Sequence, residues 1–266
     1  FAAVPLPDGN ALFTMVDVTD STRIEAALRE RARALEEADR VRTDFVANMS
    51  YELRTPLTSI GGFAEMLAAG YAGKLAPAAA DYVAAILQSV ERLSKLVDDV
   101  LDLTQGEKGP PPIEHERIDL AGLTRSVVDR LQATADAKKQ DVVTQIDPAT
   151  GVVIGDARRL REALEHVLSN ALAYTDTGGR IEVRGGGDDQ QAVISVSDNG
   201  PGIAPEDRQR VFERFTRIGG ARGEAALGLG LPLARQFVEA HGGKVELDSE
   251  LGKGTTVRLV IPRGSR

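Results

Sequence analysis

The sequence predicts an all-α part followed by an α+β part: a helical hairpin that forms a dimeric four-helix bundle, then a sandwich of helices on a mixed sheet. Up to about residue 104, apolar residues recur with the three-and-four spacing of amphipathic helices. A glycine- and proline-rich break follows at 105–112, and strand-like alternation appears only beyond it. We therefore divide the chain into residues 1–20, 21–104, 105–112 and 113–262.

Residues 1–20 resemble the end of a sheet that begins upstream. A turn signal, Pro5–Asn10, precedes an apolar run over 11–18, which predicts the last arm of a hairpin. A single strand is not stable alone, so we expect its sheet to lie in a preceding domain. The alternative is an N-terminal segment with no such role. Because the chain begins with Phe1, we expect a piece of a longer protein.

A long helix is predicted from Asp20, Ser21 and Thr22, whose side chains can cap a helix start, to about Ala69. Pro56 lies inside it and cannot donate to the Glu52 carbonyl, so we expect a bend beside Tyr51. The seam of this helix consists of Ile24, Leu28, Leu35, Ala38, Phe45 and Met49.

A second helix follows a hairpin loop at Gly70–Gly73 and Pro77. Two antiparallel helices with one apolar stripe each cannot bury both stripes alone, whereas two copies make a four-helix bundle. We therefore expect a homodimer. The second stripe consists of Tyr82, Ile86, Val90, Leu93, Val97 and Val100.

The part after the break mixes both periodicities. Helical spacing covers about 119–135, 157–174 and 229–241. Helices interspersed with strands in this order predict an α+β sandwich with the helices on one face of the sheet. The strand pattern is carried by Ile181/Val183, Ala192/Ile194/Val196 and Val257/Leu259/Ile261.

Composition excludes several function classes. A net charge of −8 argues against nucleic-acid binding, which needs clustered Lys and Arg. The absence of cysteine excludes disulfides and thiolate metal sites and fits a reducing cytoplasm. No apolar run reaches the roughly 20 residues that cross a bilayer, so any membrane attachment would come from segments outside this chain.

Four short motifs in the α+β part have chemistry suited to a nucleotide. Asp198 follows a strand and can accept a hydrogen bond from an exocyclic amine, while Gly200 and Gly202 let the backbone approach a flat ring. Gly228 and Gly230 open a helix, whose N-terminus favours phosphate. Each motif is weak alone. The others are Asn170, whose amide oxygen can bind Mg²⁺ or simply be a satisfied core group, and Gly252–Thr255.

Taken together, these motifs resemble a known family. Phe45–Ile60 is similar to the phosphoacceptor box of bacterial sensor histidine kinases, in which a histidine stands at the position of Tyr51. The later motifs, with Phe212–Phe215, resemble the N, G1, F, G2 and G3 boxes of the Bergerat, or GHKL, ATP-binding fold. The resemblance covers about residues 22–262, and residues 1–20 resemble the last strand of a PAS domain.

The resemblance implies binding of ATP or ADP with Mg²⁺. Asp198 would contact adenine, Asn170 would hold Mg²⁺, and residues 204–226 would form a mobile lid. The departures from the family pattern imply weak binding. They are His166 for the first Asn of the N box, Ala173 for a phosphate-directed Lys, and Ala226 and Leu227 for the leading Gly and the Thr or Ser of the G2 box.

Tyrosine changes the chemistry at position 51. A phenol with a pKa of about 10 is ionised only about once in 10³ molecules at pH 7, whereas an imidazole with a pKa of about 6.5 has a free lone pair. Glu52 resembles the family's general base, but a carboxylate with a pKa of about 4.3 suits a phenol poorly. Thr55 matches the position that orients water to dephosphorylate a partner's aspartyl-phosphate; otherwise it is an ordinary exposed threonine.

The resemblance extends to a tyrosine-bearing member of the family in alphaproteobacteria. It implies a pseudo-kinase that docks a single-domain response regulator and controls another histidine kinase in cell-cycle and division signalling, as the cytoplasmic portion of an inner-membrane-associated protein. The alternatives are an active autokinase phosphorylating Tyr51 and a GHKL ATPase of the gyrase or chaperone kind, which would need Glu at position 166. Tyr51 is then either an inert replacement, a nucleophile or an engineered change.

Overall fold

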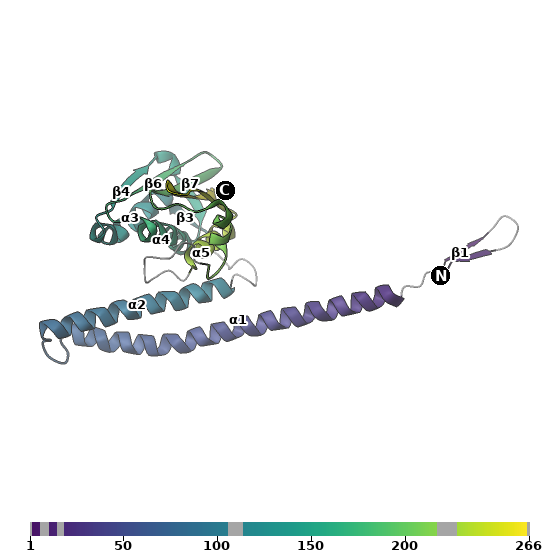
Figure 1. Ribbon diagram of the computed structural model, residues 1–266, viewed down its shortest axis with the longest axis horizontal. Coiled ribbons are helices and arrows are strands. Elements are labelled where there is room, and N and C mark those ends of the chain that lie inside the picture. The colour runs from purple at the N-terminus through teal and green to yellow at the C-terminus, as the bar shows by residue number, and fades with distance from the viewer. Residues whose placement is uncertain (1, 6–10, 15–18, 106–113, 217–227, 265–266) are drawn as a thin grey trace. The chain divides into compact units, whose positions relative to one another are not determined.

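The computed structural model describes residues 2–5, 11–14, 19–105, 114–216 and 228–264, which belong to two units, 1–49 and 50–266 (Figure 1). Near the N-terminus, β1 (Ala2–Pro5) pairs antiparallel with β2 (Ala11–Thr14). The strand predicted over 11–18 therefore pairs with a strand of this chain, β1, which was not predicted from the sequence. Residues 15–18 lie outside the described part, and the PAS assignment stays a prediction.

Helix α1 spans Thr19–Ala68 and is continuous through Pro56. It starts just before the predicted capping residues and ends one residue before the predicted end. Next to the proline, the hydroxyl of Thr58 donates to the Arg54 carbonyl at 3.0 Å and that of Ser59 to the Thr55 carbonyl at 3.2 Å. The expected bend beside Tyr51 stays a prediction.

The turn between the two long helices is built by glycine. Gly70 has a φ of 82° and donates to the Leu67 carbonyl, while Tyr71 donates to the Met66 carbonyl. This pair of bonds is a Schellman motif, which ends a helix at a left-handed residue. Helix α2 then spans Pro77–Gln105, with proline at its first position, where its missing N–H is not needed.

The hairpin buries only part of its apolar surface within one chain. Gly61 lies against Val90, where an added Cβ would be 3.3 Å from the valine side chain, so the two helices approach closely here. Much of the predicted stripe stays exposed, as expected if a second copy covers it. The exposed fractions are 62% for Phe45, 44% for Met49, 71% for Tyr82, 45% for Ile86 and 45% for Leu93.

The sandwich, residues 114–264, has a five-stranded sheet in the order β4-β6-β7-β9-β8. Its strands are β4 (Asp141–Ile146), β6 (Arg180–Gly187), β7 (Gln191–Asp198), β8 (Lys244–Glu250) and β9 (Gly254–Pro262). Only β4 and β6 run parallel. A separate antiparallel pair joins β3 (Glu116–Asp119) to β5 (Val152–Gly155).

Three helices cover one face of this sheet, as predicted (Figure 1). They are α3 (Leu120–Ala137), α4 (Ala157–Tyr174) and α5 (Gly230–Ala240). Short 3₁₀ turns lie at Pro148–Thr150, Pro205–Asp207 and Arg210–Phe212. All the strand residues predicted from period-two spacing are buried between sheet and helices. Of the predicted linker, Gln105 ends α2 and residues 106–112 lie outside the described part.

Candidate functional site

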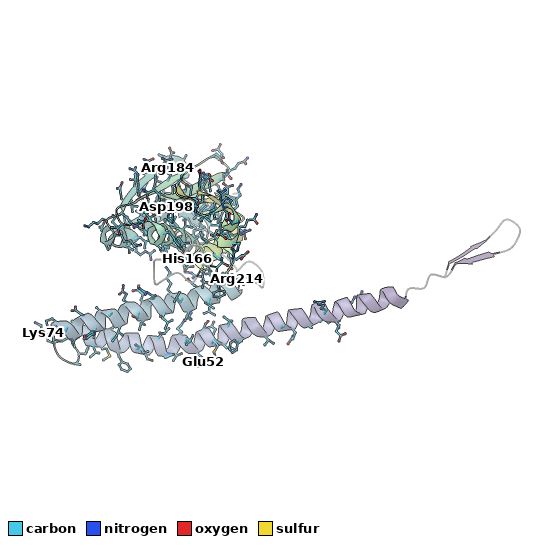
Figure 2. The ribbon with its side chains drawn as sticks, viewed as in Figure 1. Glu52, Lys74, His166, Arg184, Asp198 and Arg214 are labelled. Carbon is cyan, nitrogen blue, oxygen red and sulfur yellow. The ribbon has the colours of Figure 1, made fainter. Side chains whose placement is uncertain are left out.

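Asp198 ends the central strand β7 and lies partly buried in the sandwich (Figure 2). Its carboxylate accepts the Gly200 N–H at 2.9 Å. Burial raises the pKa of Asp198 above its ordinary value, although the amides of Gly200 and Thr255 act in the opposite direction. A half-buried carboxylate held in this way can accept a hydrogen bond from a ring amine.

The two glycines after Asp198 are required by geometry. A Cβ on Gly200 would lie 2.9 Å from the Asp198 carboxylate and 3.0 Å from the Tyr174 carbonyl oxygen, so it would displace the aspartate. Gly202 has a φ of 69°, and a Cβ there would overlap the Glu250 carbonyl. The loop after Asp198 therefore lies directly against neighbouring backbone, which leaves no room for a side chain at either glycine.

The turn between β8 and β9 is tied to the same loop. Gly252 donates its N–H to the Pro201 carbonyl at 2.7 Å. The Ile203 N–H donates to the Ser249 hydroxyl at 2.8 Å, and this hydroxyl is itself bonded within the turn region. The predicted G1 and G3 motifs thus form one hydrogen-bonded unit.

Asn170 and His166 lie one turn apart on α4 and both face the start of α5. A Cβ added to Gly230 would lie 3.4 Å from Asn170 Nδ2 and 3.5 Å from His166 Nδ1. The structure therefore brings together the N-box residues His166 and Asn170 and the G2-box residue Gly230. No group of three or more His, Asp or Glu suited to a metal occurs among the described residues.

The start of α5 carries backbone N–H groups of the kind that bind an anion. Pro232 has no N–H, and Leu233 already donates to the Leu229 carbonyl at 3.0 Å. Among the described residues, none accepts from the N–H groups of Gly230 and Leu231, which lie at the helix N-terminus, where the helix dipole favours negative charge. This end of the site fits phosphate chemistry.

Gly228 connects the predicted F and G2 motifs. Its φ is 71°, and its carbonyl accepts the Phe215 N–H at 3.2 Å. The Arg235 guanidinium lies 5.4 Å from the centre of the Phe212 ring. Of the predicted lid, residues 204–216 are described, whereas 217–226 lie outside the described part. Ala226 and Leu227 lie there too, so their predicted effect stays a prediction.

His166 is 8% exposed. Burial, and then the positive charge of Lys95, lower the pKa of His166 to about 3, so the imidazole is neutral. Its Nε2 lies 3.6 Å from the carboxylate of Asp99 on α2. Burial raises the pKa of Asp99 to about 7, so this contact is not a strong ion pair at neutral pH. Sequence reasoning missed Asp99, which has no motif around it.

Tyr51, Glu52 and Thr55 are all exposed on α1. Figure 2 labels Glu52 on this helix. Tyr51 is 56% exposed. The Arg54 guanidinium lies 5.6 Å from the centre of its ring and is also 2.5 Å from the carboxylate of Asp98 on α2. Thr55 is exposed one turn further along α1. Ala173, at the end of α4, is also exposed.

These features define a nucleotide-binding sandwich joined to a helical hairpin that displays an acceptor-type box. Two family models match the chain: the His Kinase A (phospho-acceptor) domain over residues 41–109, and the histidine kinase-, DNA gyrase B- and HSP90-like ATPase over residues 155–265. By these two domains, the chain belongs to the sensor histidine kinase family of two-component systems.

Individual relatives agree with this assignment. The chain is 37% identical to the sensor protein DivL of Caulobacter vibrioides over 258 residues, covering 97% of this chain and 33% of DivL. It is 34% identical to the histidine protein kinase DivJ of the same organism over 247 residues, covering 92% of this chain and 41% of DivJ. The chain thus spans about a third to two-fifths of these relatives.

A solved structure is similar to most of this chain. Full-length ShkA in complex with AMPPNP matches with a TM-score of 0.69 at 29% identity, over 84% of this chain and 46% of ShkA. The bound AMPPNP, an ATP analogue, belongs to the ShkA structure. In the described part of this chain, no helix has the length and apolar character of a membrane span.

Proposed function

We propose that this chain is the signalling core of a pseudo-kinase that docks a response regulator and controls another histidine kinase. The observation that carries this proposal is Tyr51 itself, an exposed tyrosine in the acceptor position of an otherwise intact box. A tyrosine phosphate ester is more stable than a phosphohistidine, so onward transfer to a regulator aspartate is uphill. The residues around Tyr51 match the family's phosphoacceptor box, whereas the histidine that carries the phosphoryl group in the phosphorelay is replaced.

The proposed partner is a single-domain response regulator, and its proposed docking surface lies around Tyr51 and Arg54. The Tyr51 ring is presented to solvent by α1 and flanked by the Arg54 guanidinium. Aromatic and arginine side chains are favoured anchors at protein interfaces. Thr55, one turn away, would orient water to dephosphorylate a regulator's aspartyl-phosphate, a role that needs no histidine. A homodimer is part of the proposal, because pairing two hairpins in a four-helix bundle would bury their exposed apolar stripes.

Nucleotide binding in this proposal is weak and depends on Mg²⁺. Asp198 would accept from the adenine amine, and the start of α5 would face the phosphates. Asn170 would be the protein ligand to Mg²⁺, which takes its other ligands from phosphates and water. This donor set fits Mg²⁺ because the ion needs only one or two protein oxygens when phosphates are bound. Ala173 provides no positive charge for those phosphates.

An ATPase of the gyrase kind is disfavoured by His166. That class uses a carboxylate to activate water, whereas the pKa of His166 is lowered to about 3, far from the near-neutral value suited to a general base. The cell-cycle role, and attachment to the inner membrane through segments outside this chain, follow from the family resemblance alone.

Tyr51 variants test the docking proposal. Tyr51→Phe should keep the affinity for the host's single-domain regulators, because only the hydroxyl is lost, whereas Tyr51→Ala should weaken it by removing the ring. Tyr71 is a matched control: it is 79% exposed and lies in the hairpin turn, so Tyr71→Ala should leave the affinity unchanged. Calorimetry with purified regulators provides the affinities.

The same variants distinguish the docking proposal from the autokinase alternative, in which Tyr51 is phosphorylated. Incubation with labelled ATP should leave wild type unlabelled. An acid-stable label on wild type that Tyr51→Phe abolishes would replace the docking proposal with tyrosine autophosphorylation. Loss of complementation in cells by Tyr51→Phe, with regulator affinity intact, would point the same way.

A further inference from the structure

One buried hydroxyl bonds both to the loop that follows Asp198 and to the strand beside it. Ser249 on β8 is 3% exposed, and a polar group so deeply buried needs hydrogen-bond partners. Its oxygen accepts the Ile203 N–H at 2.8 Å, and its proton goes to the Gly254 carbonyl at 2.9 Å. The Thr255 hydroxyl lies 2.8 Å away. Because a hydroxyl has one proton and two lone pairs, Thr255 must be the donor in this third bond.

The register of the sheet connects this hydroxyl to Asp198. Asp198 pairs with Thr255 across β7 and β9, and Thr255 pairs with Ser249 across β9 and β8. Residues directly opposite each other in antiparallel strands present their side chains on the same face of the sheet. The three residues therefore form one row, on the same face as the buried Val257, which packs under the helices.

Ser249 is connected to Asp198 along two paths. Burial raises the pKa of Asp198, whereas the amides of Gly200 and Thr255 lower it by stabilising the ionised carboxylate. One of these amides belongs to the residue whose hydroxyl donates to Ser249. The other lies in the loop whose last residue, Ile203, also donates to Ser249. Loss of the Ser249 hydroxyl would therefore disturb both groups that keep the carboxylate charged.

The ionisable residues of the neighbouring elements, among those described, make other contacts. Arg180 on β6 lies 3.7 Å from the Asp141 carboxylate on β4, and Glu250 on β8 lies 2.7 Å from the Lys253 ammonium. Tyr174 at the end of α4 lies next to the loop through its backbone carbonyl. In the described part of the chain, burial and the two amides are thus the causes that set the charge of this carboxylate.

We propose that Ser249 is a positioning residue of the nucleotide site, which holds the Asp198 carboxylate where it accepts from the adenine amine. Because Ser249 is buried, it acts through the loop and through Thr255 without touching the nucleotide. The inference rests on the nucleotide-binding part of the proposed function and concerns recognition of the base. The hydroxyl should therefore matter for the amine and not for the phosphates.

Two variants of the 266-residue chain break this network to different extents. Ser249→Ala removes the hydroxyl and all three of its bonds. Thr255→Val removes only the hydroxyl that donates to Ser249 and replaces it by a methyl group of similar size, so Ser249 keeps its bonds to Ile203 and Gly254. If a thermal melt showed that Ser249→Ala does not fold, Thr255→Val would still test the proposal.

The sheet provides a matched control pair on the same strands. The hydroxyls of Ser197 on β7 and Thr256 on β9 lie 2.9 Å apart. They are next in sequence to Asp198 and Thr255, so their side chains lie on the opposite face of the sheet. Ser197→Ala and Thr256→Val thus remove the same chemical groups without touching the loop after Asp198.

Base recognition is measured by calorimetry with two probes, Mg·ATP and the Mg²⁺ complex of purine riboside triphosphate, which lacks the exocyclic amine. Ser249→Ala should weaken ATP binding about 10-fold or more, as for loss of a hydrogen bond to a charged group. Thr255→Val should weaken it about 2- to 10-fold, as for a neutral bond. Neither should change the affinity for the probe without the amine, and both controls should bind like wild type. Equal losses for the two probes would mean a merely loosened fold and would overturn the proposal.

A second measurement needs no nucleotide. In an NMR titration of the side-chain carboxyl carbons, the pKa of Asp198 should be higher in Ser249→Ala and Thr255→Val than in wild type and the controls. As the pH falls, the two variants should therefore lose ATP affinity at a higher pH than wild type. An unchanged pKa of Asp198 in both variants would overturn the proposal.

Failure of this proposal can be told apart from failure of the nucleotide site. If wild type bound neither probe, the proposed nucleotide site would be refuted, and this role of Ser249 with it. If wild type, Ser249→Ala and Thr255→Val all bound Mg·ATP equally well, only the role of Ser249 would be refuted.

Discussion

Gly230→Ala provides the sharpest test of the nucleotide site, because it should separate binding from folding. Gly230 is the first residue of α5 and has no positive φ, so alanine fits its backbone. The added Cβ would lie 3.4 Å from Asn170 Nδ2, 3.5 Å from His166 Nδ1 and 3.6 Å from Asn170 Oδ1, which are ordinary contacts. Alanine is also the better helix former, by up to about 1 kcal/mol. Stability should therefore be unchanged or slightly higher.

Binding should respond in the opposite way. The methyl group would lie against Asn170 and His166 at the start of α5, where the phosphates are proposed to bind. A hydrogen bond to a charged group contributes about 1.5–3 kcal/mol, so losing one phosphate contact should weaken Mg·ATP binding roughly 10- to 100-fold. Calorimetry against wild type, with a thermal melt of both proteins, measures the two effects. Equal ATP affinity with an unchanged melting temperature would show that phosphates do not approach this helix end.

Three further substitutions test other parts of the reasoning. Gly202→Ala should lower the free energy of unfolding by about 2 kcal/mol or more, because alanine is strained at a φ of 69° and its Cβ would overlap the Glu250 carbonyl; denaturant titration measures this. Asp198→Asn should weaken ATP binding, and wild-type affinity should fall on acidification through the raised pKa of Asp198, a dependence that the variant should lack in calorimetry at several pH values. Tyr51→His should autophosphorylate slowly in a labelled-ATP assay; vigorous turnover would show that Ala173 matters little.

Elements with strong local signals were predictable from the sequence. The core strands β6, β7 and β9 place an apolar residue at every second position, and all these residues are buried. The three sandwich helices have wide apolar stripes, and the hairpin turn has glycines with positive φ. In each case the neighbouring residues alone determine the local structure, so no knowledge of distant contacts is needed.

Elements that depend on distant partners were missed. β4 has an irregular burial pattern and is a strand because it pairs in parallel with β6, about 40 residues further on. β8 is rich in charge and is stabilised by β9. β3 and β5 have four residues each and stabilise one another. Short or polar strands have little intrinsic preference, so pairing decides their structure.

The residues around the candidate site likewise fall into those that the sequence predicted and those that it did not. The sequence identified His166, Asn170, Asp198 and the glycines, because each belongs to a motif of fixed spacing. It did not identify Asp99 or Asp102, which lie in an ordinary amphipathic helix. Asp99 lies next to His166, and Asp102 pairs with Arg159; both partners are on α4, more than 50 residues away in the sequence.

The two neighbouring carboxylates of α2 suggest how a member of this family can signal without its histidine. Asp98 pairs with Arg54, which flanks the Tyr51 ring, whereas Asp99 faces His166 beside the nucleotide site. Because both belong to one turn of a single helix, a displacement of α2 must alter both contacts together. If nucleotide binding displaces α2 and the docking surface is as proposed, nucleotide occupancy changes the surface that a regulator meets. Such coupling requires only differential binding to two arrangements, so no phosphoryl group has to leave ATP. A tyrosine at position 51 then removes the transfer step while leaving the path from nucleotide to docking surface intact.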